Sequence, residues 1–218
     1  MRRTLATLAL GAALLLVLPL LPAQAATGLS QRFSEKGVGA EGAWSTFPAS
    51  GNPTPGVVYV DTYINAVRQA TLLNGTRLSG NVLFVDEFRY EFNSRGRPIF
   101  VSDTSGTAHG SRVTLSVDNQ LGSSSATATV RLRVCTATGC THGGTATVSA
   151  SWTADGPKVL VNGTSLVHTK GFTDIQHQHG FTRDATARAT VSDVTRLGPL
   201  QFADIFNMRS SDVCVGTC

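Results

Sequence analysis

The stretch "ATATVRLRV", residues 126–134, alternates apolar residues with threonine or arginine along its whole length. A period of two is that of a β-strand, in which successive side chains point to opposite faces of the sheet. One face of this strand is therefore predicted to be buried and the other to face water, as is typical of antiparallel sheets. The residues expected on the buried face are Ala128, Val130, Leu132 and Val134.

The same alternation recurs in four other stretches, at 82–92, 113–117, 146–152 and 185–191. In the first of them, the aromatic side chains are expected in the core and the charged ones in solvent. The residues predicted to be buried there are Val82, Phe84, Phe88, Tyr90 and Phe92, and those predicted to be exposed are Glu87, Arg89 and Glu91. The other three stretches are expected to bury Val113, Leu115, Val117, Ala146, Val148, Ala150, Trp152, Ala185, Ala187, Ala189 and Val191.

Short turn sequences separate these stretches. Asn-Gly at 74–75 and at 162–163 favours the positive φ angles of two-residue hairpins, and 94–98 and 154–157 combine glycine with proline. The only helix expected is a turn or two within 198–212. These features predict a single-domain antiparallel β-sandwich of about eight to ten strands, jelly-roll or Ig-like, with a closed β-barrel as the alternative.

The N-terminus has the three parts of a secretory signal peptide. Arg2 and Arg3 precede an apolar run from Leu8 to Leu21, and Ala23-Gln24-Ala25 is the small-x-small pattern of a cleavage site. We therefore expect residues 1–25 to be a signal peptide, 26–56 an N-terminal segment with a proline-rich loop, and 57–218 the sandwich domain. The apolar run is shorter than the roughly 20 residues of a membrane span, so a secreted, extracellular protein without a membrane span is expected.

Charge gives little reason to expect a nucleic-acid partner. Removal of Arg2 and Arg3 leaves 16 lysines and arginines against 14 aspartates and glutamates. Nucleic-acid binding requires a concentrated basic surface, which this nearly neutral chain does not predict.

Four cysteines form two close pairs in the sequence, Cys135 with Cys140 and Cys214 with Cys218. Oxidising conditions outside the cell favour disulfides, and local pairing is favoured because Cys135 and Cys140 face each other across an expected hairpin. Pairing between the two clusters and a four-cysteine zinc site are the alternatives.

His177 and His179 are separated by one residue and would lie on the same side of a strand. Two such imidazoles can reach one zinc ion if His168 or Asp174 supplies a third ligand. The other interpretation, which we favour, is a solvated polar strand that needs no cofactor, because residues 176–179 include no apolar side chain.

Signatures of catalysis are absent from the sequence, including a Gly-x-Ser-x-Gly elbow, a His-Glu-x-x-His motif and a glycine-rich phosphate loop. Glu87 and Glu91 lie about 13 Å apart along a strand, which is too far for the two carboxyls of a glycoside hydrolase. Asp61 and Asp86 fall among aromatic residues, where each is either turned outward by a β-bulge, which we favour, or buried with a raised pKa.

Trp44 is the aromatic residue we consider as a surface contact, although we favour the interpretation that it packs over an open end of the sandwich. Together these observations predict a secreted, non-catalytic β-sandwich that binds an extracellular surface, glycan or protein partner. A metal-binding protein or metal-dependent hydrolase that uses His177 and His179 is the first alternative, and a secreted inhibitor is the second. No oligomeric state is predicted.

Overall fold

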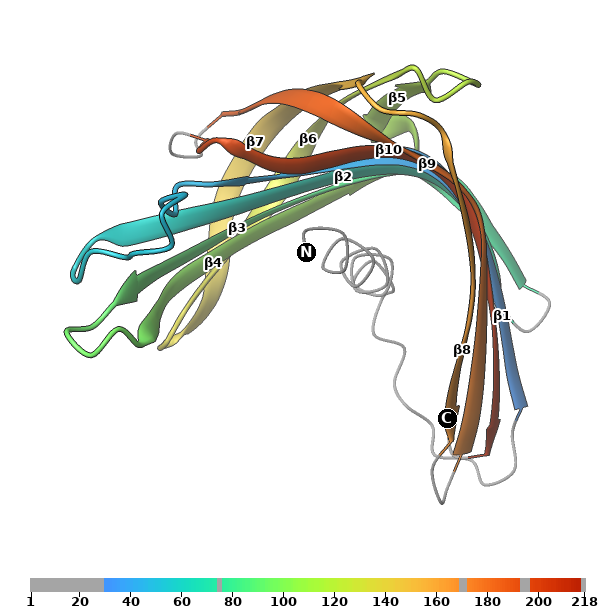
Figure 1. Cartoon of the computed structure of the whole chain (residues 1–218), viewed down its shortest axis with the longest axis horizontal. Coiled ribbons are helices and arrows are strands. Elements are labelled where there is room, and N and C mark those ends of the chain that lie inside the picture. Colours follow the sequence, from blue (N-terminus) through green and yellow to red (C-terminus); the bar gives the residue numbers. More distant parts are fainter. Residues whose placement is uncertain (1–29, 74–75, 169–171, 193–196, 217–218) are drawn as a thin grey trace.

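The computed structural model describes residues 30–73, 76–168, 172–192 and 197–216. These residues form an antiparallel β-structure (Figure 1), which confirms the predicted fold class. The strands are β1 Ser30–Ser45, β2 Val58–Leu73, β3 Thr76–Phe92, β4 Pro98–His109, β5 Val113–Val117, β6 Ser123–Thr136, β7 Gly139–Ala154, β8 Val159–His168, β9 Phe172–Val191 and β10 Leu200–Gly216. A 3₁₀ turn, Gly110–Arg112, joins β4 to β5, and none of the described residues forms a helix long and apolar enough to cross a membrane.

The strands belong to one sheet rather than two. Pairing runs in the order β10, β1, β2, β3, β4, β6, β7 and β9, with β5 attached to β6 and β8 to β9. Residues 185–191 of β9 pair with β7, whereas its residues 172–184 pair with β10. The chain of pairings therefore returns to its start. One sheet folds over onto itself and joins its own edges, which is consistent with the expected sandwich and also with the closed arrangement given as its alternative.

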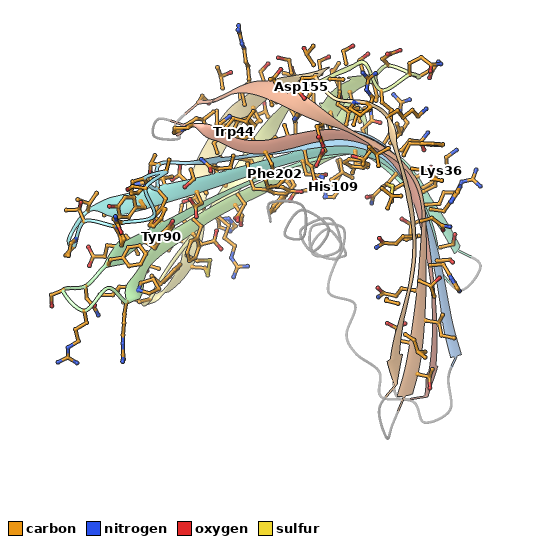
Figure 2. The ribbon with its side chains drawn as sticks, viewed as in Figure 1. Lys36, Trp44, Tyr90, His109, Asp155 and Phe202 are labelled. Carbon is orange, nitrogen blue, oxygen red and sulfur yellow. A yellow bond between two sulfur atoms is a disulfide. The ribbon has the colours of Figure 1, made fainter. Side chains whose placement is uncertain are left out.

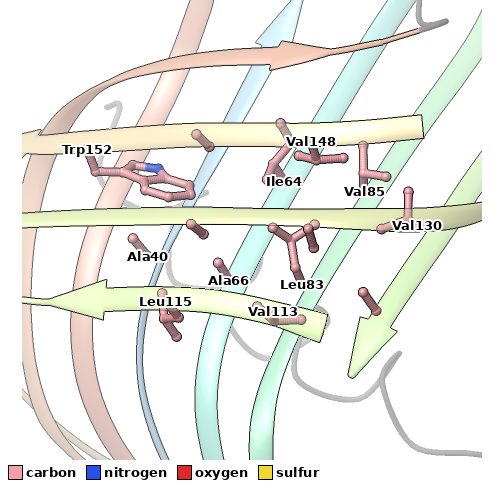
Figure 3. Packing of buried hydrophobic residues seen from close by; sticks show 14 of the residues in the cluster. Ala40, Ile64, Ala66, Leu83, Val85, Val113, Leu115, Val130, Val148 and Trp152 are labelled. Atoms are coloured by element: carbon pink, nitrogen blue, oxygen red, sulfur yellow. The ribbon is translucent and has the colours of Figure 1, made fainter. Parts of the chain in front are cut away.

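The core lies between the two layers of this folded sheet (Figure 3). Strands β5, β6 and β7 cross over β1, β2 and β3, and the side chains of the two layers meet between them. The alternation that predicted β6 and β7 is confirmed, because Val130, Val148 and Trp152 are all buried. We call the side of the strands that faces this core the inner face and the opposite side the outer face.

The strands extend beyond the core as a limb made of β8 together with parts of β1, β9 and β10 (Figure 1). A second, smaller cluster of buried residues lies where the limb leaves the body: Val67, Val82, Phe206 and Met208. Large apolar side chains on the limb remain exposed, among them Leu160, Leu166 and Phe181.

The N-terminal segment is more ordered than predicted. Residues 30–45 form β1, which pairs with both β10 and β2 and contributes Ala40 to the core. Only residues 46–57 form a loop between β1 and β2, which agrees with the proline-rich loop predicted there. The sequence of β1 is rich in glycine and charged residues and lacks the clear alternation of the other strands, which is why it was not recognised.

Two local predictions are wrong. Asn162 and Gly163 do not form a hairpin but lie within β8, opposite His179 and Gln178 of β9, and Gly163 has no positive φ. Residues 200–216 form β10 and no helical turn. In both places, pairing with a long neighbouring strand determines the conformation instead of the local sequence.

The other predicted turns are consistent with the structure. Leu73 pairs with Thr76 on either side of residues 74–75, which themselves lie outside the described residues. Gly96 has a φ of 69° in the turn between β3 and β4, as its place in the predicted turn 94–98 requires. Residues 155–158 connect β7 to β8.

Except for Val82, which is buried in the second cluster as predicted, the two faces of β3 are reversed relative to the prediction. Leu83 and Val85 are buried in the core, and Glu87, expected in solvent, is also buried on this inner face. Phe84, Phe88 and Tyr90 lie on the outer face instead. The aromatic residues of β3 therefore do not form the core of the body.

Candidate functional site

The outer face of β10, β1, β2, β3 and β4 presents aligned rows of acidic and aromatic residues. Because the strands are antiparallel and in register, residues that are paired in the sheet lie side by side on one face. The first row comprises Asp184, Asp204, Glu41, Asn65 and Phe84 on successive strands β9, β10, β1, β2 and β3. The second comprises Ala43, Tyr63, Asp86 and Ser105, and the third comprises Ser45, Asp61, Phe88 and Asp103.

Three acids are direct neighbours in the first row. Glu41 is only 2% exposed, and one of its carboxyl oxygens accepts hydrogen bonds from the Tyr63 hydroxyl and, at 3.4 Å, from Asn65 Nδ2. Burial raises the pKa of Glu41, and burial with the charges of Glu41 and Asp184 raises that of Asp204 to about 7. Like charges on neighbouring strands repel each other, and for Asp204 this repulsion adds to the effect of burial.

Asp86 and Asp61 lie in the second and third rows. Burial, a hydrogen bond with Asp103 and the negative charges of Asp103 and Glu87 raise the pKa of Asp86 to about 7. Asp61 accepts a hydrogen bond from Ser45 Oγ at 2.5 Å, and its charge, after burial, contributes to the raised pKa of Tyr90. The two aspartates therefore share a surface but differ in their hydrogen bonding.

These two aspartates line an open pocket with a volume of about 570 Å³. Its walls come from the outer-face residues Tyr63, Phe88 and Tyr90, and from residues of the loop that follows β1, including Phe47 and Pro48. Ligand pockets typically measure about 300–1,000 Å³ and combine apolar walls with a few polar groups, and this pocket has both properties. No lysine or arginine is found among the described residues that line it.

Aromatic side chains extend the pocket toward the turn that joins β3 to β4, and Figure 2 shows Tyr90 at this end of the molecule. The ring centroid of Phe88 lies 5.8 Å from that of Tyr90 and 5.5 Å from that of Phe100. Phe47 contacts Tyr59, with 5.2 Å between their centroids. The rim of this end also includes five exposed apolar residues: Val57, Val58, Phe88, Ile99 and Phe100.

No β-bulge interrupts the pairing at Asp61 or Asp86, so the predicted bulges are wrong. Register irregularities lie instead between Ala43 and Trp44, between Arg89 and Tyr90, and between Arg131 and Arg133. The acids and the aromatic residues share one face because that face is not the core. The second interpretation, a raised pKa, holds for Asp86.

Trp44 is 4% exposed and packs in the core, where it also forms part of the wall at the inner end of the pocket. Contact with a ligand could therefore reach this side chain only through the pocket. The side chain of Glu87 is buried on the inner face, on the opposite side of β3 from Asp86. It accepts a hydrogen bond from Arg89 Nε at 2.6 Å.

His177 and His179 lie on β9 in the limb, and both side chains are exposed. Neither residue lines the pocket. The Thr164 hydroxyl lies 3.0 Å from His177 Nδ1, as expected for a cross-strand pair on a solvated face. No group of three or more histidine, cysteine, aspartate or glutamate residues able to hold a metal occurs within the described part of the chain.

The strand register bears on the suggested third zinc ligands. His168 pairs with Thr173, and its side chain lies outside the described residues. The residue of β8 opposite His177 is Thr164, four positions and about 13 Å along the strand from His168. Asp174 is three residues from His177 and so points to the opposite face. The backbone therefore brings neither residue close to the histidine pair.

Cys135 and Cys140 form a disulfide across the β6–β7 hairpin, with their Cα atoms 4.0 Å apart. Local pairing is thus confirmed for this pair. The side chains of Cys214 and Cys218 lie outside the described residues.

The chain matches no known family model, no curated protein and no solved structure. The site must therefore be interpreted from its own residues. Sequence reasoning identified Asp61 and Asp86 as unusual but did not predict that they line one pocket. The signal was an acid flanked at two residues' distance by aromatic residues on both sides, in β2 (Tyr59 and Tyr63) and again in β3 (Phe84 and Phe88).

Proposed function

We propose that this protein is exported and binds a neutral oligosaccharide in the pocket on its outer face. The observation that carries the proposal is the combination, in one open pocket, of the aromatic side chains Phe88 and Tyr90 with the carboxyl groups of Asp61 and Asp86. Flat aromatic rings offer apolar platforms for the faces of sugar rings, and carboxyl and hydroxyl groups can hydrogen-bond sugar hydroxyls. Export is supported by residues 1–25, which have the pattern of a signal peptide.

Charge supports a neutral ligand over an acidic one. Two aspartates line the pocket, and no cation does so among the described lining residues. A uronate or sulfated sugar would place its own negative charge beside these acids, which is unfavourable. A glycan is therefore favoured among the surface, glycan and protein partners that the sequence suggested.

The experiment is isothermal titration calorimetry with cellohexaose, xylohexaose, mannohexaose and chitohexaose, and with oligogalacturonate as the anionic probe. At least one neutral hexaose should bind, and the anionic probe should not. Phe88→Ala should weaken binding about tenfold, which corresponds to about 1.4 kcal/mol.

Phe181→Ala is the matched control, because Phe181 is 38% exposed and Phe88 40%, but Phe181 lies on β9 and does not line the pocket. It should bind like the native protein. Absence of binding to every neutral hexaose, or equal weakening in the two variants, would contradict the proposal.

A further inference from the structure

Asp61 and Asp86 lie at diagonal positions on β2 and β3 and line the same pocket. Asp86 pairs with Tyr63 of β2, and Asp61 is two residues from Tyr63 on the same face. Such diagonal positions on neighbouring antiparallel strands have Cα atoms about 7–8 Å apart. Backbone positions at this spacing allow two aspartate side chains to place their carboxyl groups about 6.5–9.5 Å apart. That is the carboxyl separation in glycoside hydrolases that invert the anomeric carbon, and it leaves room for a water molecule.

The surroundings of the two aspartates suit different roles. Asp86 is partly buried near the acids Asp103 and Glu87, and burial together with these neighbours raises its pKa to about 7, so that it can hold a proton near neutral pH. Asp61 accepts a hydrogen bond from Ser45 Oγ, which orients its carboxyl group. A proton donor and an oriented proton acceptor thus line the same pocket.

We propose that Asp86 and Asp61 hydrolyse a glycosidic bond of a neutral oligosaccharide in this pocket, with Asp86 as the acid and Asp61 as the base. This inference rests on the proposed binding function and assigns a reaction to the same site. It replaces the non-catalytic role expected from the lack of catalytic sequence motifs, since two carboxyl groups on separate strands leave no such motif.

The reaction consumes one water molecule. Asp86 donates its proton to the glycosidic oxygen as the bond from that oxygen to the anomeric carbon breaks, and the bonding electron pair goes to the leaving oxygen. Asp61 accepts a proton from the water molecule, whose oxygen forms the new bond to the anomeric carbon from the opposite side. Exchange with solvent then returns the proton to Asp86 and removes it from Asp61, so no other reactant is needed.

The test is incubation of the protein with each hexaose that binds, followed by chromatography of the products and NMR of the new anomeric carbon. The native protein should release shorter oligosaccharides with inverted configuration. Asp86→Asn and Asp61→Asn should each lower the rate by about 10²–10⁴-fold while affinity for the hexaose is kept. Retained binding also shows that these isosteric variants are folded.

Asp155→Asn is the matched control. Asp155 is exposed between β7 and β8, and Figure 2 shows it well separated from Tyr90. Its rate should equal that of the native protein. Binding without cleavage by the native protein would overturn the hydrolysis and leave the binding function standing, whereas absence of binding would remove both. Cleavage that persists in both pocket variants, or a product of retained configuration, would overturn the assigned roles.

Discussion

Strands β1 to β3 carry different surfaces on their two faces. The inner face presents small and branched apolar side chains such as Ala40, Ile64 and Leu83, which pack against β5, β6 and β7. The outer face presents Glu41, Asp61 and Asp86 among tyrosines and phenylalanines. The smaller side chains allow the two layers to approach closely, whereas the large aromatic ones lie on the opposite face of the same strands.

Under the proposed function, this difference separates the face that stabilises the fold from the face that binds a ligand. Burial of apolar surface on the inner face stabilises the fold. Burial of carboxyl groups on the outer face opposes ionisation and provides no comparable stabilisation, yet it creates proton donors beside an apolar pocket. Substitutions on the two faces should therefore have different consequences.

The largest effect is expected from a pair of substitutions on β3. Leu83 is 0% exposed. The substitution Leu83→Ala should lower the unfolding free energy by about 2–5 kcal/mol. Phe88→Ala on the outer face should cost about 1 kcal/mol or less, because surface positions contribute little. Urea unfolding of both variants measures the difference. Equal losses would show that the outer face is part of the stabilising core.

The next effect concerns pH. The pKa of both Asp86 and Asp204 rises from 3.8 to about 7 on folding. Between these values the folded state binds protons that the unfolded state has released, so the unfolding free energy should fall as pH rises from about 4 to about 7.

The double variant Asp86→Asn/Asp204→Asn should lose this part of the pH dependence, because asparagine does not titrate. Urea unfolding at several pH values between 4 and 8 measures the slope for both proteins. An unchanged slope in the variant would mean that the outer-face acids titrate normally.

The smallest effect on the unfolding free energy is expected from substitutions on the limb, which extends beyond the core. Because His177 and His179 are exposed, replacing both with alanine should change the unfolding free energy by no more than about 0.5 kcal/mol. Zinc should leave the melting temperature unchanged in native and variant proteins. A stoichiometric zinc-dependent rise that disappears in the variant and below about pH 5.5 would establish a metal site there.

The sequence predicted the inner layer better than the outer face. The clear alternation in β6 and β7 predicted Val130, Val148 and Trp152 in the core, because small apolar and hydroxylated residues leave little doubt about which face is dry. On β3, both faces carry large or apolar side chains, and alternation alone predicts that the aromatic face is the core. Which of two such faces is covered depends on where distant strands pack, and local alternation does not record that.

The candidate site depended on register, which the sequence alone did not provide. Asp61 and Asp86 are 25 residues apart in the chain, and their proximity follows from the pairing of Tyr63 with Asp86. Glycine-rich β1 likewise gave no clear strand signal, although it supplies Ser45, the hydrogen-bond donor to Asp61. The unusual residues were thus visible in the sequence, but their common pocket was not.

Side-chain footprinting with hydroxyl radicals, in the presence and absence of a saturating neutral hexaose, tests most directly whether the outer face is the binding surface. Phe47, Phe88 and Tyr90 should lose labelling when the hexaose is bound, whereas Leu166 and Phe181 on the limb should be labelled equally in both samples. Protection of the limb residues, with unchanged labelling of Phe88 and Tyr90, would contradict binding of the hexaose on the outer face.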